Sequence, residues 1–509
     1  MDNSSCSASY KLVENNELGR HWVADRDIPA GVVIFREKAL IQGPLLREED
    51  YKNSIIICFG CNRKLNKKIT KRCSKCWYPV CGVECEKLEC HAEYECPIFS
   101  KKSPWLSIDL CVAEYESICI LRGFLYNSKQ PSRQKRCNEL MILQSEQTLP
   151  ISTVDLSFGQ YRCNLGRKQF GLMDKIGSSS EWMKIFKIIK LNAFSTYGEH
   201  TDYSSQYIFF KGSFFAHSCL ANCEYSISPE TSEFQIFTSV HITKGTPLTV
   251  NYISGQKRFG FMATMERNQL IRARGFICSC ARCQDPEECG SNFSTLRCTN
   301  CKEATLVPVK EEEQLVWKCR NDGCSVFMDW FDVDKMMINV EEMCHLKETT
   351  KEKMECIEQA SKTLMHRNFS TIVTLKFQLW EELRDKEPWQ ICGQDWNYYV
   401  RLTEELMDAY DYICPGLSEM RVNLLKVYCE SVLERELEDM LDDTVFCTLE
   451  NRTVIINLMD KLDKYWTEIL QYQSLSIDLP VHLKQNCVDT ISNKISHIAG
   501  YRIAIESVE

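Results

Sequence analysis

The residues best suited to chemistry in this chain are its cysteines, which number 30 among 509 residues. The densest group combines seven cysteines with one histidine: Cys58, Cys61, Cys73, Cys76, Cys81, Cys85, His91 and Cys96. Zinc takes four nitrogen or sulfur ligands in a tetrahedron, and a Cys-x2-Cys turn places two thiolates on one ion. The spacing therefore predicts two zinc ions, which must supply the folding energy of a segment with little apolar core. The four paired spacings argue against the alternative, a chance cluster of thiols.

Two further cysteine groups follow. Cys278, Cys280 and Cys283 supply three thiols and need a distant fourth ligand, for which the spacing leaves Cys219 and Cys289 open as candidates. The last group has the spacing of a zinc ribbon, with two pairs separated by 17 residues: Cys298, Cys301, Cys319 and Cys324. The sequence thus predicts about four zinc ions in all.

The bulk properties of the chain indicate where these cysteines work. No apolar run approaches the ~20 residues that cross a bilayer. The first residues also lack the basic start and apolar stretch of a secretory signal. We therefore expect no membrane segment and a location in the cytoplasm, the nucleus or both. In these reducing compartments clustered cysteines bind metal rather than form disulfides.

The net charge of −9 makes the chain a poor whole-molecule candidate for nucleic-acid binding, because such binding relies on basic side chains that neutralise phosphate. A mildly acidic protein is better suited to a basic partner, such as a lysine-bearing tail. A local exception is the basic stretch within the first cysteine group: Arg63, Lys64, Lys67, Lys68, Lys71 and Arg72. This stretch allows a direct contact with DNA, although the sequence favours an ordinary solvated face.

Periodicity predicts the elements that hold these residues. Residues 1–50 are typical of short strands broken by turns, and apolar alternation predicts strands again from about 205 to 253. Residues 101–190 and 341–509 instead show the 3.6-residue apolar period of helices. One apolar stripe in the last region comprises Leu417, Met420, Leu424, Tyr428 and Val432.

The most informative polar residues lie in a short segment of the second strand region. The segment reads Phe215-Ala216-His217-Ser218-Cys219-Leu220-Ala221-Asn222-Cys223, and a later strand ends in Asn251-Tyr252. Taken alone, a histidine beside a strand is more often a packed core residue, and a tyrosine at a strand end more often packs than reacts. The order of all the motifs along the chain is more specific than any one of them.

In that order the motifs resemble the SET-and-MYND (SMYD) lysine methyltransferases. The chain has Gly19-Arg20 in a first strand pair, an inserted cysteine finger, the His217–Asn222 motif, Tyr252, and then Phe276 before the Cys278-x-Cys280 cluster. The resemblance implies an α+β protein: a β-rich SET fold with an inserted MYND zinc finger, a zinc-bound post-SET segment and ribbon, and an all-helical C-terminal domain. The ribbon resembles that of the arthropod-expanded SmydA branch.

The expected organisation has six segments. They are the N-terminal part of the SET fold (1–50), the MYND finger (51–100), a helical insertion (101–190), the SET core (191–275), the post-SET segment with the ribbon (276–340) and the helical C-terminal domain (341–509). In the family, the motif cysteine is the missing ligand of the post-SET cluster, which selects Cys219.

The resemblance also assigns the finger ligands to two ions. Cys58, Cys61, Cys81 and Cys85 would share one ion, and Cys73, Cys76, His91 and Cys96 would share the other. The family usually has His-x3-Cys, whereas four residues separate His91 from Cys96 here. Cys90 is a spare thiol beside this departure.

The activity that the resemblance implies is methyl transfer from S-adenosylmethionine (AdoMet) to a lysine of a protein substrate. Tyr252 would sit beside the transferred methyl group, and Phe194 would line the lysine channel. His217 would meet the adenine through its backbone, and Phe276 would stack on it. The residues expected to contact the cofactor are Gly19, Arg20, His21, Asn192, Ala216, His217, Tyr252 and Phe276.

Two residues depart from the family pattern. His21 stands where the first cofactor loop has its second glycine, and Ala216 stands where the family has asparagine. Losing one hydrogen bond to a charged group costs about 1.5–3 kcal/mol. The first hypothesis is therefore a protein-lysine N-methyltransferase acting on a histone or another protein in transcriptional regulation. The second is an adaptor of the corepressor type, with a weak or inactive catalytic site, which binds partner proteins through its MYND finger and helical C-terminal domain.

Overall fold

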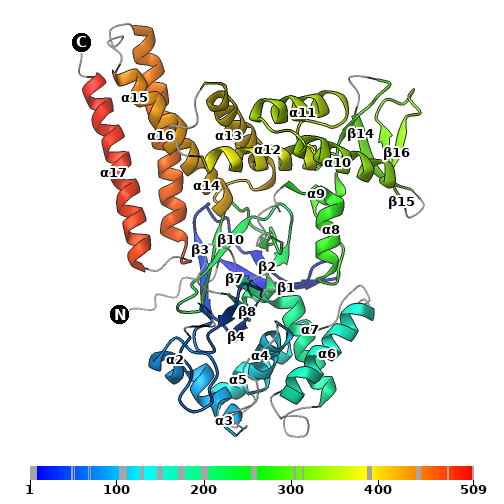
Figure 1. Cartoon of the computed structure of the whole chain (residues 1–509), viewed down its shortest axis with the longest axis vertical. Helices are drawn as coiled ribbons and strands as arrows, with labels where there is room; N and C mark the ends of the chain where they lie inside the picture. Colours follow the sequence, from blue (N-terminus) through cyan, green and yellow to red (C-terminus); the bar gives the residue numbers. More distant parts are fainter. Residues whose placement is uncertain are drawn as a thin grey trace.

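The computed structural model describes most of the chain. The described residues are 9–46, 50, 52–66, 68, 70–101, 112–125, 131–145, 153–169, 178–196, 204–253, 261–301, 305–311, 314–386, 393–442, 449–478 and 481–506. Its middle consists of small β-sheets, with a finger and a helical insertion at one end and a helical C-terminal region at the other (Figure 1).

The central strands span β1 Tyr10–Asn15, β2 Gly19–Ala24, β3 Val33–Lys38, β4 Ile41–Pro44, β7 Phe194–Thr196, β8 Ser205–Ile208, β9 Ala216–His217, β10 Cys223–Ile227, β11 Glu233–Thr238 and β12 Thr249–Val250. β1 and β2 form a hairpin, and two antiparallel sheets have the orders β10-β11-β3 and β4-β8-β7. β9 and β12 pair in parallel, with Ala216 opposite Thr249. This pairing brings the His217 segment beside the strand that precedes Tyr252.

Several of the central strands are largely buried, with consecutive buried residues along β8 and β11. Phe234 and Ile236 of β11 are fully buried, and Phe215 and Phe209 pack in the same core. Val250 of β12 ends inside this core as well. Aromatic and β-branched side chains fit such a pleated, buried surface. The core therefore fixes the place where the chain leaves β12 toward Tyr252.

The finger comprises the hairpin β5 (Ile55–Ile57) and β6 (Lys64–Asn66), the short helices α2 (Val83–Lys87) and α3 (Cys96–Phe99), and a π-helical turn at Cys90–Glu95. It packs on α4 (Val112–Leu125) of the insertion. Arg122 of α4 is buried, forms an ion pair with the buried Glu95, and donates to the carbonyl oxygens of Phe59 and Gln42 at 2.7 Å each. One guanidinium thus joins the finger, the insertion and β4.

The insertion continues with three more helices: α5 (Pro131–Met141), α6 (Thr153–Gln169) and α7 (Ser179–Asn192). A capping box between Ser178 and Glu181 starts α7, and Trp182 and Ile185 anchor its buried face. The helix ends at Asn192, directly before β7. This junction places Asn192 and Phe194 beside the central sheets.

After the SET-like sheets come α8 (Thr264–Arg272), α9 (Ala281–Gln284) and a four-stranded antiparallel ribbon in the order β13-β14-β15-β16. The ribbon strands are β13 Leu296–Arg297, β14 Thr305–Glu311, β15 Gln314–Cys319 and β16 Phe327–Asp329.

Helices make up the C-terminal region. They are α10 Trp330–His345, α11 Thr350–Thr363, α12 Ser370–Arg384, α13 Gln394–Ile413, α14 Glu419–Tyr428, α15 Glu434–Asp442, α16 Leu449–Leu475 and α17 Val481–Glu506. Figure 1 shows α16 and α17 side by side along one flank of the molecule. The predicted mixed fold with a helical C-terminal region is confirmed, and α10 spans the segment boundary expected at residue 341.

A glycine turn docks this helical region on the central sheets. Gly416 has a φ of +82°, a conformation that L side chains rarely adopt. An added Cβ would lie 2.1 Å from the carbonyl oxygen of Ser239, and the Leu417 amide donates to that same oxygen at 3.0 Å. Only glycine allows this close approach.

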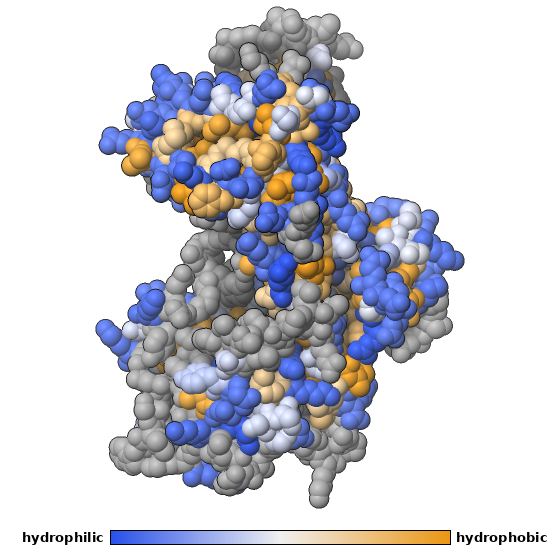
Figure 2. Space-filling view, turned by 90° about the vertical axis from the view of Figure 1, so that its right-hand side faces the viewer, coloured by the Kyte–Doolittle hydropathy of each residue, from blue (hydrophilic) through white to orange (hydrophobic). Residues whose placement is uncertain are grey.

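Exposed apolar side chains gather on the upper lobe of the molecule in the view of Figure 2, where the ribbon and α10 lie. Phe327 of β16 is 66% exposed and Phe331 of α10 is 72% exposed. Among the helices of the described residues, none has both the length and the apolar character needed to cross a membrane.

Candidate functional site

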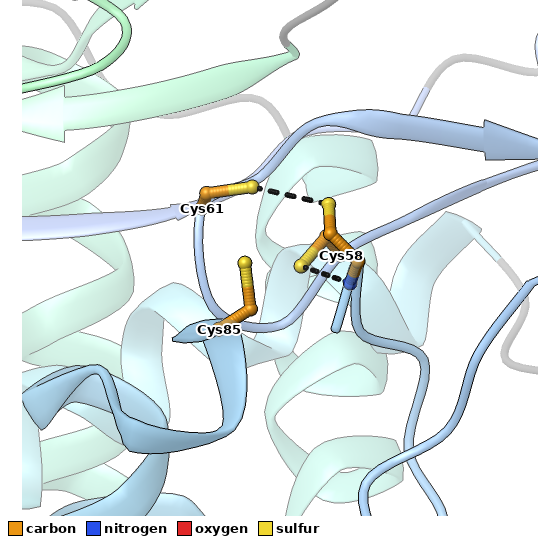
Figure 3. A group of neighbouring side chains, drawn as sticks. Cys58, Cys61 and Cys85 are labelled. Atoms are coloured by element: carbon orange, nitrogen blue, oxygen red, sulfur yellow. Dashed lines mark hydrogen bonds between the residues drawn. The ribbon is translucent and has the colours of Figure 1, made fainter. Parts of the chain in front are cut away.

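The finger brings its eight predicted ligands together in two groups. The sulfur atoms of Cys58, Cys61, Cys81 and Cys85 lie within 4.8 Å of one another. In Figure 3 the thiols of Cys58, Cys61 and Cys85 point toward a common space. The second group comprises Cys73, Cys76, His91 and Cys96. These are the two sets that the family resemblance implies.

The geometry around His91 favours Nε2 as the nitrogen that would bind a metal ion. Nε2 lies 3.5 Å from the Cys76 sulfur, and Nδ1 lies 3.5 Å from the carboxylate of the buried Glu95. A carboxylate beside the second nitrogen orients a histidine for metal binding. The spare thiol of Cys90 instead donates to the carbonyl oxygen of Gly60. The longer His-x4-Cys spacing is therefore accommodated within the π-helical turn.

The post-SET cluster gathers Cys219, Cys278, Cys280 and Cys283 within 4.8 Å. Cys219 comes from the loop after β9, 59 positions before Cys278. The other candidate ligand, Cys289, is exposed and is not part of the group. The fourth group, Cys298, Cys301, Cys319 and Cys324, closes the ribbon. All four groups offer the sulfur or nitrogen donors, in sets of four, that zinc requires.

Arg267 of α8 is a positively charged neighbour of the post-SET thiols. Its Nε donates to the Cys219 sulfur at 3.3 Å, and its Nη2 donates to the Cys283 sulfur at 3.5 Å. The same buried guanidinium pairs with Glu288 at 2.6 Å, and Arg282 pairs with the same carboxylate at 2.9 Å. Four thiolates on one zinc ion would carry excess negative charge, which this buried cation would partly offset.

Tyr252 lies just past β12 and is held by two hydrogen bonds. Its backbone amide donates to Nδ1 of His217 at 3.1 Å, and its hydroxyl donates to the carbonyl oxygen of Phe215 at 2.5 Å. Burial raises the pKa of Tyr252 to about 12, although the nearby Arg274 opposes the shift. The rings of His217 and Phe276 lie 5.3 Å and 6.3 Å from the Tyr252 ring. The hydroxyl is therefore a protonated, fixed group near neutral pH.

Tyr252 also lines a cavity of about 230 Å³. The lining includes Asn192, Phe194, Gly212, Tyr225, Tyr252 and Arg274. Three of these residues have roles that the resemblance implies: Phe194 and Tyr252 at the methyl-transfer site, and Asn192 in contact with the cofactor. Sequence reasoning missed Tyr225 and Arg274, because β10 and the segment after α8 reach the cavity only through the fold. Their order in the sequence gives no signal for this role.

The other residues assigned to the cofactor do not line this cavity. His217 and Phe276 contact Tyr252 through their rings, and Ala216 is buried in β9. The turn between β1 and β2 approaches the post-SET segment, where Ser279 donates to Glu17 at 3.4 Å. The structure thus places parts of the first loop and of the post-SET cluster side by side.

Three residues assigned to the cofactor have side chains in contact with backbone carbonyl oxygens of the protein itself. His21 is 1% exposed, and its Nδ1 lies 2.9 Å from the carbonyl oxygen of Gly19. Arg20 donates to the carbonyl oxygen of Ile142 at 2.6 Å and lies over the Phe214 ring. The amide of Asn192 donates to the carbonyl oxygens of Ile188 and Gln144, at 2.8 Å and 2.9 Å.

The basic stretch of the finger takes part in its own packing. Lys64 lies 3.4 Å from Asp50, and Arg72 donates to the carbonyl oxygen of Trp77 at 3.3 Å. Lys67 lies outside the described residues. A contact of this stretch with DNA stays a prediction.

Comparisons with known proteins add to this geometry. The family model of the SET domain matches residues 19–253. Two Drosophila melanogaster relatives, isoforms A and B of SET domain-containing protein SmydA-8, are 24% and 22% identical over 322 residues, or 61% of this chain. A SET and MYND domain-containing protein of Dictyostelium discoideum is 24% identical over 310 residues, or 52% of this chain.

The chain spans less than two thirds of the length of these relatives, at 64%, 66% and 58%. A solved structure, the SET domain of LSMT bound to lysine and AdoHcy, is 12% identical, with a TM-score of 0.31 over 89% of this chain and 95% of that one. The SET match begins at Gly19 and ends just after Tyr252, and so includes the inserted finger and most of the cavity lining, whereas Leu270, Ala273 and Arg274 lie beyond it. Residues 19–253 are thus similar to a SET domain, and the chain is similar to SET-and-MYND proteins over about half of its length or more.

Proposed function

We propose that this chain is an AdoMet-dependent protein-lysine N-methyltransferase that works on a histone or another protein in the nucleus or cytoplasm, in transcriptional regulation. The observation that carries the proposal is the cavity of about 230 Å³ that Asn192, Phe194 and Tyr252 line within the matched SET region. An aromatic, partly enclosed cavity of this kind suits the aliphatic stem of a lysine.

The hydroxyl of Tyr252 has a defined hydrogen-bonding role. Because it donates its proton to the carbonyl oxygen of Phe215, it can only accept a hydrogen bond from a lysine amine. That acceptance would orient the nitrogen lone pair for an in-line attack. When bound, AdoMet supplies a methyl group on a sulfonium leaving group.

The cavity also favours the neutral form of the lysine. A free lysine amine has a pKa near about 10.4 and must lose a proton before it can attack. Removing the amine from water lowers its pKa, and so does a neighbouring cation. Phe194 and Tyr225 provide apolar walls, and the guanidinium of Arg274 lines the same cavity. The surroundings of the amine thus assist its deprotonation.

The side chains at the site are of the types that can hold AdoMet, but two contacts of the family pattern are missing. The half-buried ring of Phe276 offers aromatic surface suited to an adenine, and the resemblance brings the backbone of the neighbouring His217 to the same place. Ala216 offers no side-chain hydrogen bond, and the imidazole of His21 fills a buried position in the first loop. The residues would therefore hold AdoMet with fewer contacts than the family pattern provides. The four zinc groups would fix the finger, the post-SET segment and the ribbon around this site.

The test combines binding and transfer. Titration calorimetry of AdoMet against the pure protein should give submillimolar affinity, and radiolabelled AdoMet should label a protein substrate from a nuclear extract. Tyr252→Phe should leave the AdoMet affinity within about three-fold but lower methyl transfer at least ten-fold, or about 1.4 kcal/mol. Tyr412→Phe, at an exposed position of α13, is the matched control and should change neither quantity. Equal transfer by wild type and Tyr252→Phe would contradict the assigned role.

The second candidate function is the adaptor. The buried His21 and Ala216 favour it, and so do the exposed Phe327 and Phe331, because large exposed apolar groups often mark protein-binding surfaces. Its partners would bind through the finger and the helical C-terminal region. A protein that shows no AdoMet binding at millimolar concentration, yet is folded and zinc-loaded, would support the adaptor over the enzyme.

A further inference from the structure

Large exposed apolar side chains gather at the end of the ribbon and along α10. Phe327 lies on β16, Phe331, Ile338 and Met343 lie on α10, and Leu346 is the residue at which the helix ends. Figure 2 shows apolar residues on the lobe that holds these elements. Single exposed apolar residues are common, whereas a group of them marks a surface that another molecule covers. We call these five residues the α10 surface.

The apolar pattern of α10 is unusual for a helix at the surface. Val333, Val340 and Cys344 are buried and belong to the core of the C-terminal region. An ordinary surface helix has polar residues on the opposite face. In α10 that face carries Phe331 and Ile338, which are about two turns apart and therefore lie in line along the helix. The helix thus has a second apolar stripe, which no described element covers.

Local contacts fix this surface in place. The Asp329 carboxylate accepts from the backbone amide of Asp332 at 2.9 Å and so caps the start of α10. The ring of Trp330, the first residue of the helix, lies 6.0 Å from the ring of the buried Trp317 on β15. The ribbon and α10 are therefore joined where the α10 surface begins. A partner would meet a preformed surface, which lowers the entropy cost of binding.

Carboxylates surround the apolar stripe. The helix has one lysine, Lys335, against four carboxylates: Asp332, Asp334, Glu341 and Glu342. In the described part of the chain, none of these four carboxylates forms an ion pair. Residues four apart on a helix are neighbours, so Glu342 lies between Ile338 and Leu346. The α10 surface therefore has acidic surroundings.

This combination selects the kind of partner. The cytoplasmic face of a membrane carries anionic lipids, which the carboxylates would repel. A second copy of the chain would bring two sets of the same carboxylates together, and like charges oppose such a contact. A protein segment with basic residues beside its apolar ones would instead cover the apolar side chains and pair its charges with the carboxylates.

We infer that the α10 surface binds a segment of a partner protein in which apolar side chains are interspersed with lysine or arginine. The inference goes beyond methyl transfer, since it requires neither a bound cofactor nor an active catalytic site.

The experiment uses the full-length, zinc-loaded protein and a library of peptides of about five helical turns displayed on phage. In each peptide an apolar residue recurs at every third or fourth position, and the other positions are lysine, glutamate, glutamine or serine. Peptides enriched by the wild type should carry lysine at least ten-fold more often than glutamate beside the apolar stripe. Fluorescence anisotropy of the best peptide should show at least ten-fold weaker binding when its lysines are replaced by glutamate.

A substitution in the stripe tests whether the α10 surface is the site. Phe331→Ser should weaken binding of the best peptide at least ten-fold. Ile503→Ser, at a similarly exposed position of α17, is the matched control and should leave the affinity within about two-fold. Because both side chains are exposed, scanning fluorimetry should show that both variants remain folded.

Charge reversal tests the acidic surroundings. Glu341→Lys combined with Glu342→Lys should transfer the preference of the library from lysine to glutamate. Lysines near the end of α10 suit the helix dipole, so this variant should stay folded. Glu430→Lys combined with Glu438→Lys makes the same change in net charge at exposed positions elsewhere and should keep the preference for lysine.

The contrary results are distinct. No enriched peptide, or enrichment without a preference for lysine, would overturn the inference. A loss of binding in the control variants as large as in the α10 variants would also overturn it. Binding to vesicles of phosphatidylcholine and phosphatidylserine that Phe331→Ser abolishes would assign the surface to a membrane instead. Self-association in light scattering that Phe331→Ser abolishes would assign it to a second copy of the chain.

Discussion

The guanidinium of Arg267 lies 3.3 Å from the sulfur of Cys219, and both groups are buried. Arg267 belongs to α8, whereas Cys219 belongs to the loop after β9, so the contact joins the post-SET cluster to the helix that precedes it. Glu288 completes the arrangement by accepting from Arg267 and Arg282. A zinc site there would have two arginines and one glutamate as neighbours rather than apolar residues alone.

Arg267→Met should loosen zinc at the post-SET cluster. The substitution removes a cation that faces two thiolates and leaves Glu288 with one partner fewer, and breaking a buried pair typically costs about 3–5 kcal/mol. Zinc release to a coloured chelator should show one of about four ions leaving markedly faster. Arg401→Met is the control, since Arg401 of α13 pairs with Glu358 of α11 and neither residue belongs to a cysteine group. Unchanged release kinetics would show that Arg267 does not stabilise the metal.

Metal analysis of the pure protein should find about four zinc ions per chain. Structural zinc contributes about 10–16 kcal/mol per site in small fingers, so its removal should unfold the segments that it holds. Under a strong chelator, scanning fluorimetry should show a lower melting temperature and early loss of the finger. A zinc-free protein with an unchanged melting temperature would refute the metal assignment.

Gly416→Ala should destabilise the docking of the helical C-terminal region. The new Cβ would collide with the Ser239 carbonyl at a positive φ, where incompatible substitutions cost more than about 1 kcal/mol. Gly500→Ala is a matched control in α17, because its Cβ would meet no atom within 4 Å and alanine favours the helix by about 0.5–1 kcal/mol. Urea denaturation should therefore move the two variants in opposite directions.

A half-buried carboxyl at the same junction should make stability depend on pH. Burial, aided by the nearby Glu419 and Asp478, raises the pKa of Glu224 on β10 from its ordinary 4.5 to about 8. Between these values the folded state keeps a proton that the unfolded state has lost, so the free energy of unfolding should fall as the pH rises through this window. Glu224→Gln should flatten that decline in urea denaturation. Glu230→Gln, exposed on the turn of the same hairpin, should retain it.

The cysteine spacing contained most of the information needed for the four ligand groups. Tetrahedral coordination restricts which short spacings can share an ion, so local sequence was enough for the ribbon, and the family resemblance chose Cys219 over Cys289. The structure gathers the groups in the same sets. Fold class could likewise be predicted, because strands and helices differ in apolar period.

The cavity could not be predicted in the same way. Arg274 lines it because the segment after α8 meets the end of α7, where the guanidinium donates to the carbonyl oxygen of Lys190, and this depends on long-range packing. Nor does the sequence show that the Tyr252 hydroxyl is already engaged with Phe215, or that the Asn192 amide bonds to two carbonyl oxygens. Contacts to backbone oxygens have no signature in residue type.

The buried Arg122 has a consequence for how the finger can work. Its guanidinium forms an ion pair with Glu95 of the finger and hydrogen bonds to backbone oxygens of the finger and of β4. Separating the finger from the insertion would therefore leave a buried charge without its partner. Glu95 in turn adjoins the ligand His91, so the metal geometry and the seating of the finger are set together. A protein bound by this finger would therefore be held at a fixed angle and distance from Tyr252.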